Sequence, residues 1–226
     1  MMKKTIAILF SLVMILGFAA CVNSSSQTEQ SSKEEHSEEI STEMETGDVS
    51  ESQPEETDIP DVQEKTVLVA YFSATGTTEG VAEQIANGLN ADIYEIVPEE
   101  PYTDEDLDYS NNNSRATVEM NDPDARPAIS GGVENMEQYD IVFIGYPIWW
   151  GEAPRIINTF VESYDFSGKT IVPFCASGSS GIGSSAANLE QLTSGAQWFS
   201  GQRFSGNDSQ DAVMELVNSL GLNFEE

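Results

Sequence analysis

Hydroxyl side chains and a glycine are concentrated in one short segment near residue 75. Residues 73–78 read Ser-Ala-Thr-Gly-Thr-Thr and directly follow the apolar run 66–72. Hydroxyls, free backbone N–H groups and a helix N-terminus together can hold a phosphate. The segment has no lysine and is neither a Walker A nor a GxGxxG loop, which favours a terminal monophosphate. An ordinary N-capped turn is the alternative. The expected phosphate contacts are Ser73, Ala74, Thr75, Gly76, Thr77 and Thr78.

Two adjacent tryptophans stand in a second segment, residues 145–154, which also follows an apolar run. A half-exposed pair of this kind suits stacking on a flat aromatic ligand. Core packing is an equally good explanation for Trp149 alone, but not for both rings. The candidate ligand contacts in this segment are Pro147, Ile148, Trp149, Trp150 and Gly151.

A third segment, residues 177–183, consists almost entirely of serine and glycine. Small residues let backbone N–H groups come close to a ligand. Its candidate contacts are Ser177, Gly178, Ser179, Gly181 and Gly183. Cys175, just before this segment, lies in an apolar run and is expected to be an inert core residue.

Strands that alternate with helices must position these three segments. The pattern predicts a parallel sheet with helices on both faces. Ligands of such sheets bind beyond the carboxyl ends of the strands, so the three segments should meet. The expected strands are 66–72, 92–97, 139–145, 169–176 and a weak 197–204; the expected helices are 76–89, 154–164, 181–192 and 208–220, the last with Asp208 as N-cap.

The alternation is interrupted between residues 98 and 138, a stretch that contains four prolines and a run of asparagines. One or two helical turns are expected around 114–120. Long irregular segments inside compact domains are usually functional loops or lids. We therefore expect residues 98–138 to be a functional loop or lid.

The order Tyr-x-Ser-x-Thr-Gly-x-Thr in residues 71–78, followed by Val81-Ala82 and Ile85, resembles the phosphate-binding signature of flavodoxins. Ala70 replaces a larger apolar residue, which is a packing variation. The resemblance covers about residues 66–220. It implies a flavodoxin-like three-layer α/β/α sandwich, a five-stranded parallel sheet of order 2-1-3-4-5, and FMN with its 5′-phosphate on residues 73–78.

The resemblance also implies roles for the other two loops. Trp150-Gly151-Glu152 matches the family's aromatic-glycine-acid run, so Trp150 rather than Trp149 is expected on the isoalloxazine. Flavodoxins commonly carry a second stacking aromatic in the third loop, and residues 177–183 contain none. That face of the flavin is expected to be open or covered by segment 98–138, with Tyr102 and Tyr109.

Electron transfer is the function that the resemblance implies, with FMN passing electrons to redox partner proteins or small acceptors and no catalytic acid or base. One alternative is a flavin-dependent NAD(P)H:quinone-type oxidoreductase, because residues 147–154 also resemble the corresponding loop of those enzymes. Against it, the domain has only six basic residues and no cluster of them for an NADPH phosphate. A non-redox binding module that has lost flavin is the other alternative.

The N-terminus predicts export. Two lysines, an apolar run over 6–18 and Ala-Ala before Cys21 are typical of a signal peptide ending in a bacterial lipobox, although Phe18 stands where leucine is favoured. A plain secreted protein is the alternative. Residues 22–64 hold fourteen acidic residues, one lysine and no aromatic, which predicts a disordered spacer, or alternatively a merely solubilising tail. The expected parts are a signal peptide (1–20), lipidated Cys21 with an acidic linker (21–64) and one domain (65–226), on the cell surface or in the periplasm.

Charge and composition exclude several classes of function. With 9 Lys+Arg against 39 Asp+Glu, the net charge is −30, which excludes nucleic-acid binding and disfavours adsorption to anionic lipid. Membrane contact is therefore expected through the lipid anchor only. Two cysteines, Cys21 and Cys175, and one histidine, His36, give no disulfide framework and no metal site.

Overall fold

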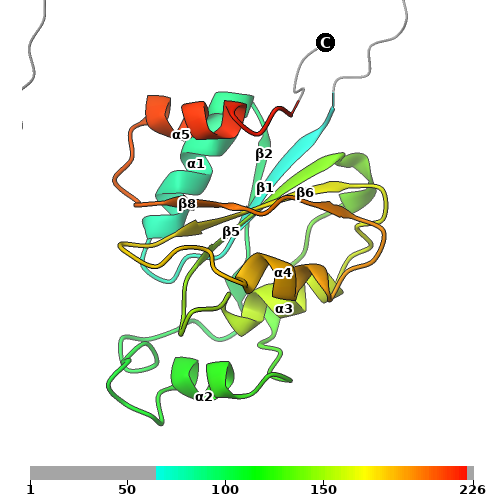
Figure 1. Ribbon diagram of the computed structural model, residues 1–226. Helices are drawn as coiled ribbons and strands as arrows, with labels where there is room; N and C mark the ends of the chain where they lie inside the picture. The colour runs from blue at the N-terminus through cyan, green and yellow to red at the C-terminus, as the bar shows by residue number, and fades with distance from the viewer. Residues whose placement is uncertain (1–64, 223–226) are drawn as a thin grey trace, which may run out of the picture. The chain divides into compact units, whose positions relative to one another are not determined.

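A parallel sheet with the strand order β2-β1-β5-β6-β7 forms the centre of the computed structural model, which describes residues 65–222 (Figure 1). The predicted order 2-1-3-4-5 is confirmed, but the fifth position holds two short strands, because β8 also pairs with β6. The strands are β1 (Val67–Tyr71), β2 (Asp92–Glu95), β5 (Ile141–Pro147), β6 (Thr170–Ala176), β7 (Gln197–Trp198) and β8 (Gln202–Phe204).

The break between β7 and β8 has a local cause. It lies beside Pro173 of β6, which has no N–H to donate to a neighbouring strand. Gly201, at φ +85°, makes the bend, and a Cβ there would lie 2.4 Å from Ile182 and 3.0 Å from Pro173. The weak strand expected over 197–204 is therefore two segments joined by a glycine bend.

Helices cover both faces of the sheet (Figure 1). On one face, α1 packs on α5 and contacts β1; its partner residues in β1 are Val67, Val69 and Tyr71. Leu68 and Ala70 point to the other face, as the alternation of side chains along a strand requires. The helices are α1 (Thr77–Leu89) and α5 (Gln210–Asn218) on the first face and α3 (Arg155–Glu162) and α4 (Ser185–Glu190) on the second.

Two predicted helix starts were wrong. Ser209, not Asp208, caps α5, because its Oγ accepts from the Ala212 N–H at 3.3 Å while Asp208 accepts from the Ser205 N–H at 2.6 Å in the preceding turn. The helix expected from 181 begins at Ser185, since Gly183 has φ +57° and keeps the preceding residues in a loop.

The interruption between β2 and β5 is an ordered excursion. Its ends are joined by an antiparallel pair, β3 (Val97–Pro98) with β4 (Ile129–Ser130), and a short 3₁₀ helix, η1 (Met136–Gln138), follows. We call residues 99–128 the excursion. The helical turns expected around 114–120 are confirmed as α2 (Arg115–Asn121), capped by Ser114.

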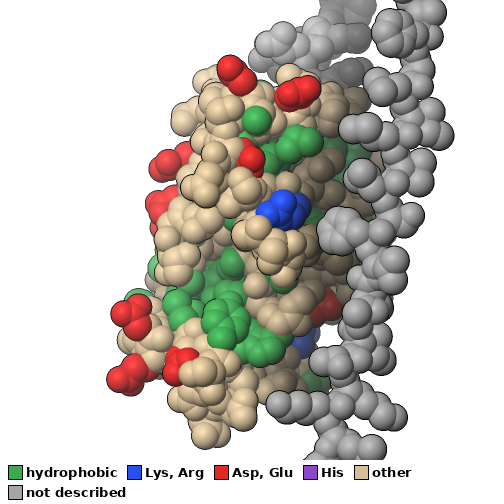
Figure 2. Space-filling model, turned by 60° about the vertical axis from the view of Figure 1, so that its left-hand side comes forward, with side chains coloured by type: hydrophobic (Ala, Val, Ile, Leu, Met, Phe, Trp, Pro, Cys, Tyr) green, Lys and Arg blue, Asp and Glu red, His purple; other side chains and the backbone are tan. Residues whose placement is uncertain are grey.

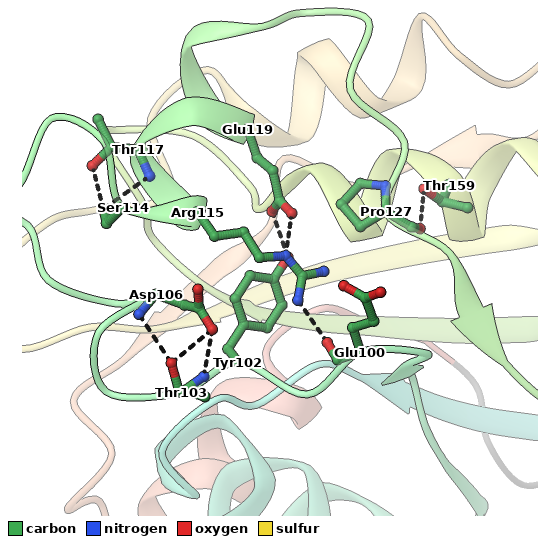
Figure 3. A network of polar contacts seen from close by, with 10 residues as sticks. All are labelled: Glu100, Tyr102, Thr103, Asp106, Ser114, Arg115, Thr117, Glu119, Pro127 and Thr159. Atoms are coloured by element: carbon green, nitrogen blue, oxygen red, sulfur yellow. Dashed lines mark hydrogen bonds and ion pairs between the residues drawn. The ribbon is translucent and has the colours of Figure 1, made fainter.

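Polar contacts hold the excursion together (Figure 3). The Arg115 guanidinium pairs with Glu119 at 2.7 Å and lies 4.1 Å from the centre of the Tyr102 ring. The Tyr102 hydroxyl donates to Glu119 at 2.5 Å, and burial together with this carboxylate raises the pKa of Tyr102. One charged cluster thus fixes the Tyr102 ring.

Other contacts fasten the excursion to α3. Arg126 binds both carboxylate oxygens of Glu162 at 2.6 and 2.8 Å, and Thr159 donates to the Pro127 carbonyl at 2.9 Å. Arg155 also donates to the Met120 carbonyl at 3.1 Å. The excursion is therefore attached to the second helical face at several points.

The predictions made for the N-terminus lie outside the described residues. These include the signal peptide, Cys21, His36 and the acidic linker. Within residues 65–222, no helix combines the length and apolar character needed to cross a membrane.

Candidate functional site

A cavity of about 430 Å³ opens at the carboxyl ends of the central strands. It lies where the strand order reverses, because the chain leaves β1 for β2 on one side and later adds β5 on the other. Its volume is in the usual range for small-ligand sites. Ser73, Ala74, Thr75, Thr77, Thr78, Asp104, Leu107, Tyr109, Pro147, Trp149, Ala176, Ser177 and Gly178 line it.

The three segments singled out by sequence all contribute to this cavity. Nine of their candidate residues line it, five from the first loop, two from the second and two from the third. The other candidates belong to the same loops but do not line the cavity: Gly76, Ile148, Trp150, Gly151, Ser179, Gly181 and Gly183. The convergence of the loops is present, whereas their contact with a ligand stays a prediction.

The first loop has the properties of an anion site. Gly76 precedes α1 in a left-handed conformation, φ +81°, and no side chain caps the helix. The hydroxyls of Thr75 and Thr77 lie 3.5 Å apart, and the Ser73 hydroxyl is buried without a hydrogen-bond partner among the described residues. No lysine or arginine is among the residues that line the cavity. An anion here would be held by hydroxyls and N–H groups.

Trp149 is both a core residue and a wall of the cavity. It is 3% exposed and lies edge-on to Phe72 at 5.6 Å and to Tyr102 at 5.2 Å, between ring centroids. Tyr102 is itself fixed by Glu119 and Arg115, so the excursion supports the tryptophan from behind. These contacts fix the orientation of the Trp149 ring beside any planar ligand in the cavity.

Trp150 does not line the cavity, whereas Trp149 does, and the expected stacking of Trp150 on a flavin stays a prediction. Trp150 and Gly151 have φ of +49° and +85° and form a two-residue turn, closed by two hydrogen bonds between Trp149 and Glu152 at 2.9 and 3.0 Å. Positive φ at both central residues is typical of a type I′ turn. The turn carries the 41% exposed Trp150 ring onto Tyr109, at 4.5 Å and 30°.

Glu152 and Arg203 are two positioning residues whose contacts the sequence did not indicate. The Glu152 carboxylate accepts from Ser184 at 3.0 Å and Asn188 at 2.9 Å, which joins the second loop to the start of α4. Arg203 of β8 donates to the carbonyls of Ser177 and Gly178 at 2.7 and 2.8 Å, and so holds the third loop. The one signal for Arg203 was its place in the weak strand, where it pairs with Cys175, two residues before the third loop begins.

The excursion supplies three cavity residues. Tyr109 had been expected as a covering residue, while Asp104 and Leu107 had no signal in the sequence. Tyr102, the other expected aromatic, lies behind Trp149 and outside the cavity lining.

Cys175 is fully buried in β6, and burial raises the pKa of its thiol to about 11. It is a free thiol. Within the described part of the chain, no group of three or more histidine, cysteine or acidic side chains could hold a metal ion.

The sequence profile of the flavodoxin family matches residues 66–220. A crystal structure of a candidate flavoprotein from Bacteroides eggerthii is 47% identical, covering 70% of this chain and 99% of its own, with a TM-score of 0.66. A similar protein from Bacteroides uniformis is 43% identical over 69% and 99%, again at 0.66. A Lactobacillus acidophilus flavoprotein solved in complex with FMN is 21% identical over 62% and 93%, with a TM-score of 0.51, and shares the fold. No curated protein matches the chain significantly.

Proposed function

The chain belongs to the flavodoxin family, and on this premise we propose that it binds FMN and transfers electrons between other molecules. The observation that carries the proposal is the Ser73 hydroxyl, buried and without a partner beside a helix N-terminus that no side chain caps. An unpaired buried hydroxyl costs about 1–3 kcal/mol, and a bound phosphate would supply the missing acceptor.

The residues of the cavity fit both ends of FMN. Hydroxyls of the first loop suit the terminal phosphate, which needs no metal and no basic side chain there. Trp149 offers an immobile aromatic wall to the ring system, and Ser177 and Gly178 border it on the other side. Arg203 would keep that third loop in place through its two carbonyl contacts.

When bound, FMN supplies the redox chemistry, by accepting and releasing electrons at its ring system. The chain's own residues then have to bind and orient it. No proton relay is required of the described cavity residues, of which Asp104 and Tyr109 are the titratable ones. No lysine or arginine of the described chain lines the cavity to bind the phosphate of NADPH, which favours a carrier over an NADPH-dependent reductase.

Redox kinetics test the transfer function. The FMN-loaded full-length chain should be reduced by a low-potential protein donor and reoxidised by an acceptor protein, with little oxidation of NADH or NADPH. Rapid NAD(P)H turnover would instead assign the protein to the flavin-dependent reductases. A loaded chain that exchanges electrons with none of these would contradict electron transfer.

We also propose that the protein is held outside the cytoplasmic membrane by a lipid on Cys21. The support is the order of charged, apolar and small residues before that cysteine. Cys21→Ser should move the protein from the membrane fraction to the soluble fraction. Retention of the variant in the membrane fraction would contradict lipid anchoring.

A further inference from the structure

We propose that Tyr109 is a flavin-contacting residue contributed by the excursion, and that Trp150 is a positioning residue that holds Tyr109 at the mouth of the cavity. This rests on the proposed binding of FMN and adds a contact from outside the three loops that follow β1, β5 and β6. Tyr109 lines the cavity although 57% of it is exposed, so its ring lies at the border between cavity and solvent.

The exposed aromatic pair is unusual for a surface. Single exposed apolar side chains are common, but contiguous ones often mark a binding site, and the exposed rings of Tyr109 and Trp150 stack on one another. Figure 2, which turns the left-hand side of Figure 1 forward, shows a group of hydrophobic side chains in the lower half of this face, with acidic side chains beside it, and further hydrophobic side chains near the top. Trp150 also has the positive φ that non-glycine residues rarely adopt, a strain that often marks functional sites.

Trp150 and Tyr109 each lie in a turn that is closed by local hydrogen bonds. The turn under Trp150 is closed by the paired bonds between Trp149 and Glu152. On the other side, Asp108 accepts from the N–H of Ser110 at 2.8 Å and from its hydroxyl at 2.7 Å, a local turn that encloses Tyr109. The stack is therefore a contact between two preformed turns of different segments.

Two aromatic side chains, Trp149 and Tyr109, line the cavity in which the flavin ring would bind. Trp149 is buried and fixed, and Tyr109 is an aromatic wall from a different segment of the chain. The third loop, residues 177–183, has no aromatic side chain to offer. Tyr109 thus supplies a second aromatic contact, and its position depends on Trp150.

Affinities of the full-length chain for FMN and for riboflavin test this. An aromatic contact contributes about 0.5–1.5 kcal/mol, so Tyr109→Ala should weaken both ligands equally, by about 2- to 12-fold. Trp150→Ala should weaken them less and speed their dissociation, whereas Trp150→Phe should restore binding. The double variant should match Tyr109→Ala alone, because Trp150 acts through Tyr109.

Val118→Ala is the matched control, since Val118 is a 54% exposed apolar residue of the same excursion that does not line the cavity. It should leave both affinities unchanged. If the wild type binds flavin but Tyr109→Ala does not weaken it, or if the two alanine effects add, the inference is wrong while FMN binding stands. A wild-type chain that binds no flavin would overturn the proposed function and this inference with it.

Discussion

Replacing Ser73 with alanine should stabilise the flavin-free protein and weaken FMN binding at the same time. Without ligand, the buried Ser73 hydroxyl has no partner among the described residues, which costs about 1–3 kcal/mol. Alanine removes this cost with little change in volume. At about 2–4 °C for each kcal/mol in a domain of this size, the melting temperature of the apo protein should rise by several degrees.

The same hydroxyl should bind the phosphate when FMN is present. A hydrogen bond to a charged group contributes about 1.5–3 kcal/mol, so Ser73→Ala should weaken FMN by about 10- to 150-fold. Riboflavin has no phosphate, and its affinity should not change. Calorimetric titration of both ligands and thermal unfolding of the apo protein measure the three quantities on one variant.

Ser185 provides the matched control. Like that of Ser73, its hydroxyl is buried, but it donates to the Ile182 carbonyl at 2.5 Å and lies 3.0 Å from the Tyr146 hydroxyl. Ser185→Ala should therefore lower the melting temperature, since it leaves partners unsatisfied. The reasoning is refuted if Ser73→Ala lowers apo stability as Ser185→Ala does, or if it weakens riboflavin as much as FMN.

Substitutions at four further positions test the account. Trp149→Ala should lower both the melting temperature and the affinity for riboflavin and FMN, as measured by unfolding and titration, because the ring is core and cavity wall together. Arg203→Ala frees the Ser177 and Gly178 carbonyls and should weaken both flavins in titrations, with Arg203→Lys intermediate; unchanged affinity would exclude a role for that loop. Gly145→Ala should cost about 1–3 kcal/mol in urea unfolding, since its Cβ would lie 2.2 Å from the buried Phe174 ring. Arg126 lowers the pKa of Glu162, so the ionised pair should stabilise the fold at neutral pH. Glu162→Gln should therefore destabilise the protein at neutral pH, and the difference from the wild type should disappear as the pH falls below about 4. A difference in unfolding curves that does not depend on pH would contradict this pairing.

The fold could be predicted because each strong signal was local. The continuous apolar runs that form β1, β5 and β6 are typical of strands in a parallel sheet that helices cover on both faces. The fifth position was predicted only as weak, because its division depends on Pro173 of another strand and on close packing around Gly201. Asp208 and Ser209 are both good caps in sequence, and only the turn before α5 decides between them.

The site was predictable to the level of loops but not of side chains. Strand ends place the three loops together, whereas the burial of Trp149 and the exposure of Trp150 depend on a two-residue turn that directs the two rings apart. Spacing alone could not reveal that turn, since Trp150 adopts a positive φ usually left to glycine or asparagine. The excursion's contribution depends on tertiary contacts with α3 and Trp149, which no local pattern encodes.

Titration of the purified full-length apo protein with FMN tests the central claim most directly. Saturation at one FMN per chain is expected, with quenching of flavin fluorescence by the adjacent aromatic residues and tighter binding of FMN than of riboflavin. A chain that leaves FMN fluorescence and absorption unchanged at saturating protein would contradict the account.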